Sequence, residues 1–457
     1  QSRQHPASDS PRKRVYGNRL PWYRERAHPF KPDALRKFMP ERDDQFRAPP
    51  THSSTDTIPS RLSATRRSER MNRKIFINAG EVAHFSTGKI TKPLVGLDMS
   101  SRDQIHPIGM GFVIENGVFT KIAPSQEIIA EYGRDAVTHN FGHRAIVPGY
   151  VDAHTHLIWS GDRFDEVRMR QSGMSYSEIA EAGGGIARTV NSTRKRSLEE
   201  MRRLGQSRKK IALRHGTTAM EVKSGYGGCT QSELRMLEAS PNSNGIHPTW
   251  MGAHAITRFH EHPSQRKFMA DLLSNQLPAV IEQGIAKSAD VFCEPGWFTL
   301  EQTEEICRES TASGLQIRLH VDEFTDGGGL ELAAELGAAT ADHAIHSSED
   351  ARAKAADAGT IQGFLPGTPY VLGSNEWPPI QQCIDEEWPW ALSTDFNPNC
   401  QILSLPFVGS LAVHRMNIDP IAALAAVTRN PATGISRNDG LSQGVIKEGA
   451  VANFNEL

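Results

Sequence analysis

Several features that mark common classes of protein are missing from this chain of 457 residues. The five cysteines are scattered and form no C-x-x-C pair, which argues against a disulfide framework and a thiolate zinc site and favours a reducing, cytoplasmic setting. No run of about eighteen apolar residues occurs, so no membrane-spanning helix is predicted. The net charge of -2 offers no global attraction to nucleic acid or to a membrane surface, and small-molecule ligands fit it better.

Residues 1–70 differ in composition from the rest. They carry sixteen Lys or Arg, eight Asp or Glu and nine prolines, and such a segment cannot bury enough apolar surface to offset its ordering entropy. We expect a disordered or non-native extension, with Met71 as a natural beginning. A transit peptide and a basic nucleic-acid-binding arm are the functional alternatives, and the interspersed Asp43 and Asp44 weaken both.

Residues 71–147 have the pattern of a small β domain. Two apolar-rich runs, 112–115 and 118–122, are separated by Asn116-Gly117. This dipeptide is a strong signal for a hairpin, because both residues tolerate positive φ in a type I′ turn.

From Pro148 to about residue 430, short apolar stretches alternate with helical ones. The predicted strands end near eight positions: His156, Lys223, His254, Glu294, His320, His343, Pro366 and Asp395. This rhythm predicts an α/β fold, a (β/α)₈ barrel of the TIM type, with a β-sandwich formed by the N-terminal segment and by residues 431–457. An open doubly wound sheet is the alternative, but the first βα turn lacks a G-x-G-x-x-G motif.

The most informative local pattern is Asp152-Ala153-His154-Thr155-His156, which follows an apolar run. Side chains two apart on a strand share a face, so His154 and His156 point into one space, and Asp152 is placed to orient them from behind. Paired imidazoles suit a first-row metal ion. Two strand histidines without a metal are the structural alternative.

Two further residues, His320 and Asp395, close predicted strands five and eight. Barrel enzymes draw their active sites from the carboxyl ends of several strands, so His154, His156, His320 and Asp395 can converge there. Three imidazoles and one carboxylate suit zinc or iron with room for water. A helix cap is the plainer role for a strand-end Asp.

Predicted strand four, residues 289–294, contains no lysine that could bridge two metal ions. Lys223, at the end of strand two, fits a structural ion pair at least as well as metal ligation. We therefore expect one metal ion. Glu294 is the remaining candidate for a ligand of a second metal ion.

Longer strings along the barrel resemble one family of the amidohydrolase superfamily. Pro148 to His156 looks like the opening strand of that superfamily. Six strings that follow are similar to those of imidazolonepropionases and stand in that family's order: Gly161-Asp162-Arg163, Gly183-Gly184-Gly185-Ile186, Glu221-Val222-Lys223-Ser224-Gly225-Tyr226-Gly227, Gly252-Ala253-His254, Val291-Phe292-Cys293-Glu294 and Thr394-Asp395-Phe396-Asn397-Pro398.

The resemblance implies hydrolytic ring opening of 4-imidazolone-5-propanoate to N-formimidoyl-L-glutamate in histidine degradation, with a metal-activated water and one Zn²⁺ or Fe³⁺ ion. Glu323 resembles the family's acid/base residue. That role requires strand five to have yielded to a loop after His320, because strict alternation would point Glu323 away. His254 and His343 resemble histidines that contact the ring or polarise its carbonyl.

For substrate binding, the resemblance implies Arg163 at the propionate carboxylate and Tyr226 as a further hydrogen-bond donor. Asn397, Asn399 and Cys400 match the loop that contacts substrate or product. Many family members have Gly and then Ser or Thr where Asn399 and Cys400 stand, which places a hydroxyl contact in doubt. Plainer roles are a surface ion pair for Arg163 and rim packing for Tyr226.

Two other functions remain open, and the family implies a homodimer. One is a purine or pyrimidine aminohydrolase with a similar histidine and aspartate set, and the other is a metal-free barrel that serves as a scaffold. The family usually continues with further strands beyond the position of Leu457, so we expect the sandwich to be incomplete, with an exposed strand edge.

Overall fold

The computed structural model describes residues 73–133, 137–255 and 264–457. The expectations for residues 1–70 and for Met71 lie outside these residues. Among the helices of the described residues, none combines the length and the apolar character that a membrane crossing requires.

Two four-stranded sheets form the small β domain, in the orders β5-β4-β1-β6 and β16-β7-β2-β3. Their strands are β1 (Arg73–Ile77), β2 (Val82–Ala83), β3 (Ile105–His106), β4 (Met110–Glu115), β5 (Val118–Pro124), β6 (Val137–Asn140), β7 (Ile146–Pro148) and β16 (Phe454–Glu456). The short helices here are η2 (Gly96–Met99), η3 (Arg102–Gln104) and α2 (Ser125–Tyr132). The predicted hairpin is confirmed: β4 pairs antiparallel with β5, and Asn116 and Gly117 have φ values of 52° and 77°.

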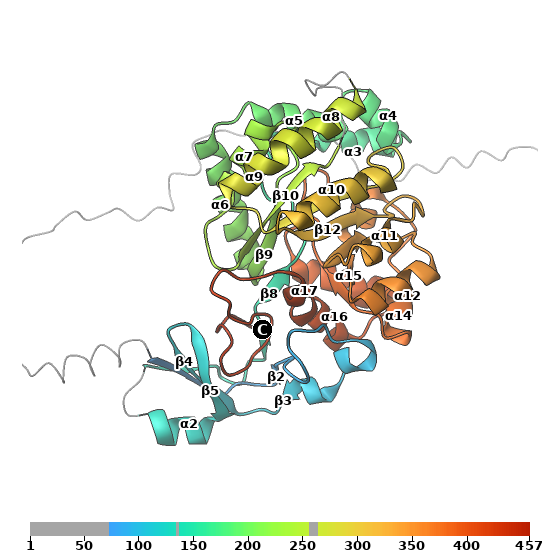
Figure 1. The fold of residues 1–457 in the computed structure, drawn as a ribbon. Coiled ribbons are helices and arrows are strands. Elements are labelled where there is room, and N and C mark those ends of the chain that lie inside the picture. The colour runs from blue at the N-terminus through green and yellow to red at the C-terminus, as the bar shows by residue number, and fades with distance from the viewer. Residues whose placement is uncertain (1–72, 134–136, 256–263) are drawn as a thin grey trace, which may run out of the picture. The chain divides into compact units, whose positions relative to one another are not determined.

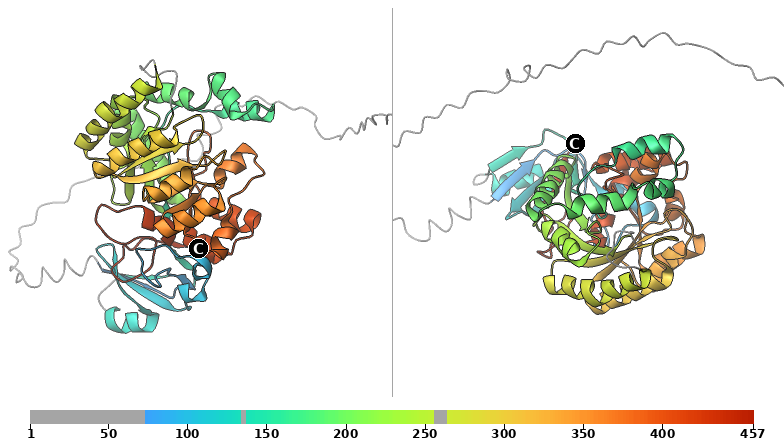
Figure 2. Two further views of the ribbon diagram at one scale, coloured as in Figure 1. Left: turned by 45° about the vertical axis from the view of Figure 1, so that its right-hand side comes forward. Right: turned by 90° about the horizontal axis from the view of Figure 1, so that it is seen from above.

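The C-terminal strand belongs to this domain. β16 pairs antiparallel with β7 and lies at the edge of its sheet. Phe454 packs against Phe112 and Phe141 in an aromatic cluster, and in Figures 1 and 2 the C-terminus lies beside the N-terminal strands. The prediction that both ends of the chain contribute to one β domain is therefore confirmed.

The second part is an eight-stranded parallel sheet ordered from β15 to β8. Its strands are β8 (Tyr150–Asp152), β9 (Thr217–Lys223), β10 (Ile246–Ala253), β11 (Ser288–Cys293), β12 (Gln316–Val321), β13 (Thr340–His343), β14 (Ile361–Phe364) and β15 (Trp390–Leu392). The two end strands meet through a parallel bridge between Thr155 and Phe396, and His156 N donates to Phe396 O at 2.9 Å. The ring is thus nearly closed, which confirms the predicted barrel and excludes the open sheet.

Helices surround the barrel strands, as Figures 1 and 2 show. They are α3 (Phe164–Gln171), α4 (Tyr176–Glu181), α5 (Gly185–Arg194), α6 (Leu198–Arg214), α7 (Thr230–Ala239), α8 (Gln265–Asp271), the π-helical turn η4 (Leu272–Gln276), α9 (Leu277–Gln283), α10 (Leu300–Ala312), α11 (Gly329–Glu335), α12 (Glu349–Ala358), α13 (Gly367–Leu372), α14 (Ile380–Asp385), α15 (Leu405–Met416), α16 (Pro420–Ala426) and α17 (Arg429–Gly434).

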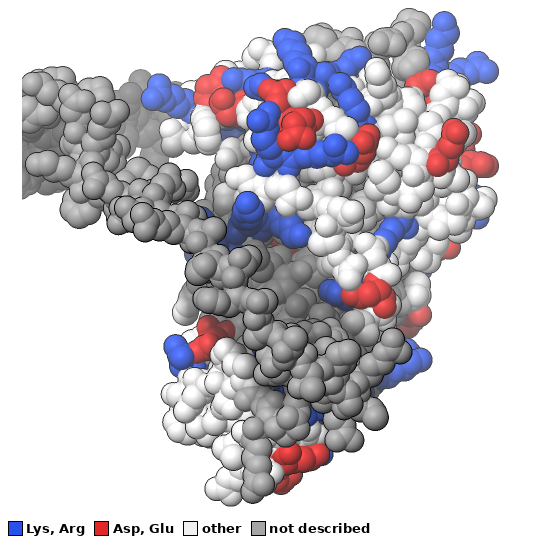
Figure 3. Space-filling model, turned by 90° about the vertical axis from the view of Figure 1, so that its left-hand side faces the viewer, with Lys and Arg blue, Asp and Glu red and all other residues white. Residues whose placement is uncertain are grey.

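Helix α6 shows why these segments pack as they do. Ser197 and Glu200 form a capping box at its start. Met201 and Ala212 are buried, whereas the basic side chains of Arg202 and its neighbours are exposed. The face in Figure 3 carries Lys and Arg with acidic side chains among them, in keeping with ion pairs such as Arg202 with Glu238. The apolar stripe of the helix therefore faces the barrel and the charged side faces water.

A buried arginine joins the β domain to the barrel. Arg429, at the start of α17, is 2% exposed and donates to the carbonyl oxygens of Phe85, Thr87, Lys89 and Lys92. These bonds fix the loop after β2 against the last helix, so the two parts share one buried polar anchor.

Candidate active site

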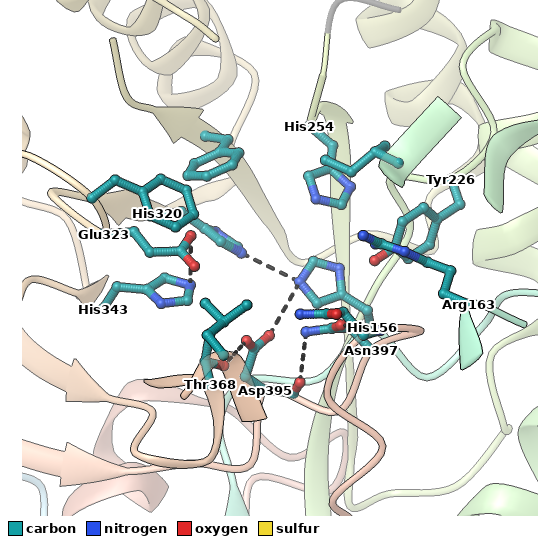
Figure 4. A pocket seen from close by; sticks show the side chains of 15 residues that line it. His156, Arg163, Tyr226, His254, His320, Glu323, His343, Thr368, Asp395 and Asn397 are labelled. Atoms are coloured by element: carbon teal, nitrogen blue, oxygen red, sulfur yellow. Dashed lines mark hydrogen bonds and ion pairs between the residues drawn. The ribbon is translucent and has the colours of Figure 1, made fainter. Parts of the chain in front are cut away.

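The four predicted metal ligands meet at the carboxyl ends of the barrel strands (Figure 4). His154 and His156 follow β8, His320 lies in β12, and Asp395 follows β15. Nε2 of His320 lies 3.3 Å from Nε2 of His156, and Asp395 Oδ1 lies 3.5 Å from His154 Nε2 and 3.8 Å from His156 Nε2. Residues separated by more than two hundred positions therefore form one cluster.

The hydrogen bonds of the histidines test whether this cluster fits a metal ion. His154 Nδ1 bonds to Asp342 Oδ2 at 2.7 Å and His320 Nδ1 to Asp290 Oδ1 at 2.9 Å. Since carboxylates only accept, each Nδ1 carries the proton and each Nε2 presents a lone pair to the centre. Within the described part of the chain, His154 Nε2 has no hydrogen-bond partner. The Nε2 lone pairs of His154 and His320 converge beside the Asp395 carboxylate, which is what a cation requires, so these residues fit a metal.

Burial keeps the imidazoles of His154 and His156 neutral. The pKa values of His154 and His156 lie well below 6.5, chiefly because burial penalises the charged form and secondarily because neighbouring cationic and imidazole groups repel a proton. A neutral imidazole is the form that ligates metals, so the local environment and the ligand role agree.

The carboxylate that orients His154 is not the predicted one. Asp152 accepts from the backbone N and the hydroxyl of Thr394, at 3.0 and 2.7 Å, and so holds the end of β15 to β8. The bond to His154 comes instead from Asp342 on β13. The prediction that the Asp152 carboxylate orients the His154 imidazole was wrong. The alternation of side chains along one strand does not show which residue of another strand bonds to a histidine.

Lys223 forms the structural ion pair that was one of its two predicted roles. Its Nζ lies 2.8 Å from Glu221 Oε1 and 2.6 Å from Asp290 Oδ2, and all three side chains are fully buried. Glu294 is also engaged elsewhere, because it accepts backbone N–H groups from residues 323–325. Among the described residues, Glu294 belongs to neither group of side chains that could hold a metal ion.

Glu323 occupies the position that its predicted role requires. β12 ends at Val321, and Asp322 then takes a φ of 48°, which reverses the alternation and turns Glu323 into the pocket. Its carboxylate lies 3.7 Å from His343 Nε2. Burial, and then the nearby carboxylates of Asp395 and Glu294, raise the pKa of Glu323 well above its usual range. The group is thereby suited to carry a proton.

His343 and Asp395 also depend on unusual backbone. Their φ values are 69° and 49°, in the left-handed region that costs a non-glycine residue about 1–3 kcal/mol. Thr368, at the start of α13, donates its hydroxyl proton to Asp395 Oδ2 and fixes that carboxylate. Strained residues thus stand at the ends of β13 and β15, both facing the metal cluster.

His254 stacks on His156, with ring centroids 5.0 Å apart, and its Nδ1 bonds to the carbonyl oxygen of Gly225 at 3.0 Å. A carbonyl only accepts, so Nδ1 donates and Nε2 is an acceptor. Burial, reinforced by His320, lowers the pKa of His254 to about 3. Gly225 has a φ of 102°, and a Cβ there would lie 2.9 Å from His254 Nδ1, so this position requires glycine.

Arg163 and Tyr226 lie on the side of the pocket opposite Glu323 and His343 (Figure 4). Arg163 is 4% exposed and its Nε and Nη2 lie 2.8 and 2.7 Å from Glu166 Oε2. The other oxygen of Glu166 accepts from Gly185 N at 2.9 Å, at the start of α5. The alternative of a surface ion pair with Asp162 or Asp165 is therefore wrong: the pair is buried and fixed to the glycine run.

The loop after Asp395 is folded by the amide of Asn397. Its Oδ1 accepts from the backbone of Asn399 and Cys400, at 2.8 and 2.9 Å, and its Nδ2 donates to Asp395 O. Asn397 and Asn399 line the pocket, and Arg170 donates to Asn399 Oδ1 at 2.8 Å. Cys400 is fully buried behind the loop with its Sγ 3.7 Å from Thr394 O, and is not on the pocket wall formed by the described residues.

Sequence reasoning missed the buried carboxylates that support the site. Asp290 and Asp342 hold the histidines, Glu166 holds Arg163, and Glu233 accepts the backbone N–H groups of Gly225, Gly227 and Gly228. Thr368, Phe292 and Phe324 also line the pocket. A usable signal existed for Asp342 and Asp290, which are charged residues inside apolar strands and therefore need a buried partner.

Solved structures share the fold. A triazine hydrolase variant superposes with a TM-score of 0.62 at 14% identity, covering 84% of this chain and 86% of its own. Guanine deaminase from C. acetobutylicum gives 0.56 at 15% identity, covering 84% and 90%. At such identities the likeness concerns the architecture alone.

Among sequences, no family model matches the chain. Imidazolonepropionase from Haloarcula marismortui is 38% identical over 344 residues, which cover 74% of this chain and 80% of the relative. The enzymes of the same name from Symbiobacterium thermophilum and Geobacillus kaustophilus are 38% and 36% identical, covering 85% and 87% of their own lengths. Since these similarities extend over most of each relative, the chain belongs to the imidazolonepropionase family.

Proposed function

We propose that the chain hydrolyses 4-imidazolone-5-propanoate to N-formimidoyl-L-glutamate, a step of histidine degradation. The observation that carries this proposal is one pocket in which a metal-ligand cluster and a buried acid/base pair face a buried arginine. An ultraviolet assay of imidazolonepropionate loss, run with and without chelator, tests it. Turnover that disappears with chelator and returns with added metal is the expected result, and no turnover by the metal-loaded protein would contradict it.

The metal centre would be held by His154, His156, His320 and Asp395, as a single Zn²⁺ or Fe³⁺ ion. When bound, such an ion acts as a Lewis acid that lowers the pKa of water and polarises a carbonyl. Imidazole nitrogen and carboxylate oxygen suit both zinc and iron, so metal analysis of the purified protein must decide between them.

Glu323 would move the proton. Ring opening requires a water proton to leave as its oxygen attacks the ring carbonyl carbon, and a proton to reach the ring nitrogen as the C–N bond breaks. Glu323 stands at the pocket wall beside His343, and burial favours its protonated form. Glu323 must be ionised to accept the first proton; its raised pKa strengthens it as a base, and the buried carboxylic acid so formed can then donate the proton to the ring nitrogen.

The two pocket histidines would act differently. His254 presents Nε2 as an acceptor because Nδ1 donates to Gly225 O. It is therefore suited to receive a hydrogen bond from an N–H group of the substrate ring, which is the first of the two roles that the family resemblance implied, contact with the ring or polarisation of its carbonyl. His343, beside Glu323, is placed to hold that carboxylate at the reacting atoms.

Arg163 and Tyr226 would bind the propionate carboxylate. A guanidinium has five N–H donors in a rigid fork, and Glu166 engages those on Nε and Nη2. The buried Glu166 fixes the plane of the group and balances its charge before substrate arrives. Arg163 lies across the pocket from Glu323, so a substrate with its ring at the metal and its chain toward Arg163 would span the cavity. Asn397 and Asn399 also line the pocket and would contact the substrate. Cys400 is not among the described residues that line it, so we propose no substrate contact for Cys400.

Two alternatives are distinguished by simple measurements. A purine or pyrimidine aminohydrolase would deaminate guanine or cytosine without turning over imidazolonepropionate. A scaffold would bind neither zinc nor iron. Arg163 lines the pocket with guanidinium N–H donors that suit the carboxylate of an acidic substrate better than a neutral base.

We extend the proposal to a cytoplasmic homodimer, as the family resemblance implies. The five cysteines are free thiols, in keeping with a reducing compartment. Sedimentation of the purified protein would test the dimer.

A further inference from the structure

Lys223 has no part in the proposed chemistry. Its ammonium group nevertheless contacts one carboxylate that bonds to His320 and another that bonds to the backbone between His154 and His156. It is fully buried on β9 and contacts Glu221 on its own strand and Asp290 on β11. We infer that Lys223 is a positioning residue that holds His320 and the His154–His156 segment in register for the metal ion. The inference rests on the proposed metal centre.

The first arm runs through Asp290. One oxygen of this carboxylate contacts Lys223 Nζ at 2.6 Å, and the other accepts from His320 Nδ1 at 2.9 Å. Because each oxygen of Asp290 has its own partner, the carboxylate cannot rotate freely, and this fixes the direction of His320 Nε2. Without the ammonium group, one Asp290 oxygen would lose its charged partner in a buried setting, and the carboxylate could turn away from the imidazole.

The second arm runs through Glu221. Its Oε1 contacts Lys223 Nζ at 2.8 Å, and its Oε2 accepts from the backbone N of Thr155 at 3.1 Å. Thr155 is the residue between His154 and His156, and its hydroxyl donates to Glu221 O at 2.6 Å. The same ammonium group therefore fixes the backbone that carries His154 and His156, directly after β8.

The position of Lys223 excludes a direct role in substrate binding. It is absent from the pocket wall formed by the described residues, and its two carboxylate partners take up its charge. The second buried cation nearby, Arg318, lies 3.9 Å from Glu221 Oε1 and is bonded instead to the carbonyl oxygens of Ala153 and Gly434, at 2.8 Å each. Arg318 therefore does not substitute for the short contacts of Lys223.

The test is a mutant cycle on Zn²⁺ affinity, measured on the full chain by competition with a chromophoric chelator. We expect Lys223→Met and Asp290→Asn each to weaken Zn²⁺ binding about tenfold to a hundredfold, the usual effect of removing support from a metal ligand. If Lys223 acts through Asp290 and Glu221, adding Lys223→Met to the paired variant Asp290→Asn/Glu221→Gln should cause little further loss. Wild-type affinity in Lys223→Met, or a further large loss when it is added to that paired variant, would overturn the inference.

Two controls separate positioning from folding. Arg429→Met removes an equally buried cation that contacts only backbone carbonyls, and should lower the melting temperature without changing Zn²⁺ affinity. Where Lys223→Met does not fold, the charge-balanced pair Lys223→Met/Asp290→Asn is compared with Asp290→Asn/Glu221→Gln: both variants interrupt both arms, so equal affinities support the inference, and a much weaker affinity of the first overturns it. Zinc binding needs no substrate, so this result stands apart from whether imidazolonepropionate is turned over.

Discussion

The two ends of the pocket are built from different kinds of element. The metal end, His154, His156, His320 and Asp395, stands on or directly after barrel strands that are hydrogen-bonded to their neighbours. The opposite end, Arg163 and Tyr226, stands on a loop before α3 and a loop after β9, braced by Glu166 and Glu233. A framework of strands fixes the reacting atoms, whereas loops set which substrate reaches them, and loops change with less damage to the core.

The largest expected effect is at the metal end. His320→Ala removes an imidazole that closes the ligand set, so we expect no retained metal and no measurable turnover. Metal analysis after gel filtration checks this. His414→Ala, an exposed histidine of α15, is the matched control and should bind metal like the wild type. Full metal content in His320→Ala would show that His320 is not a metal ligand.

Glu323→Gln separates chemistry from metal binding at the same end. The amide keeps the shape of the side chain but cannot exchange the proton, so kcat should fall about 10²-fold to 10⁴-fold while metal content stays unchanged. Glu335→Gln, an exposed position on α11, is the control. Near-normal kcat in Glu323→Gln would contradict the proton transfer assigned to it.

At the opposite end, the paired change Arg163→Met/Glu166→Gln removes both buried charges together, so that neither is left alone. We expect KM to rise about tenfold to a hundredfold, in line with the loss of charge-assisted hydrogen bonds, and kcat to change far less. Arg188→Met, which breaks the half-exposed pair with Asp165, is the control. A loss confined to kcat would mean that Arg163 belongs with the chemistry rather than with binding.

Glu166→Gln alone should have the smallest effect. The single amide oxygen can still accept from Arg163 while the bond from Gly185 N is lost, and a charge-assisted hydrogen bond is roughly twice as strong as a neutral one, so we expect KM to rise only about fivefold. Steady-state kinetics at fixed metal content measure it. An effect as large as that of the double change would assign the anchoring to the carboxylate itself.

The same contrast separates what the sequence could predict from what it could not. The barrel and the proposed metal ligands His154, His156, His320 and Asp395 follow from patterns inside single strands. The partners of these ligands come from other strands: Asp342 rather than Asp152 supports His154, because register around a closed barrel is a three-dimensional property.

Loop geometry was the other limit. The turn of Glu323 into the pocket depends on positive φ at Asp322, and the burial of Cys400 depends on the amide of Asn397. Neither is visible in residue spacing: Asp322 is not the glycine that would have signalled a left-handed backbone, and the hydrogen bonds of Asn397 come from a side chain in an irregular loop.

The left-handed residues Asp322, His343 and Asp395 have a consequence for laboratory evolution. Glycine at His343 or Asp395 would relax the backbone, and a selection for heat resistance alone would reward it. The imidazole or the carboxylate would be lost in the same step. Variants selected only for melting temperature should therefore become inactive first at these strand ends, and a screen that keeps turnover as a second criterion should leave both positions untouched.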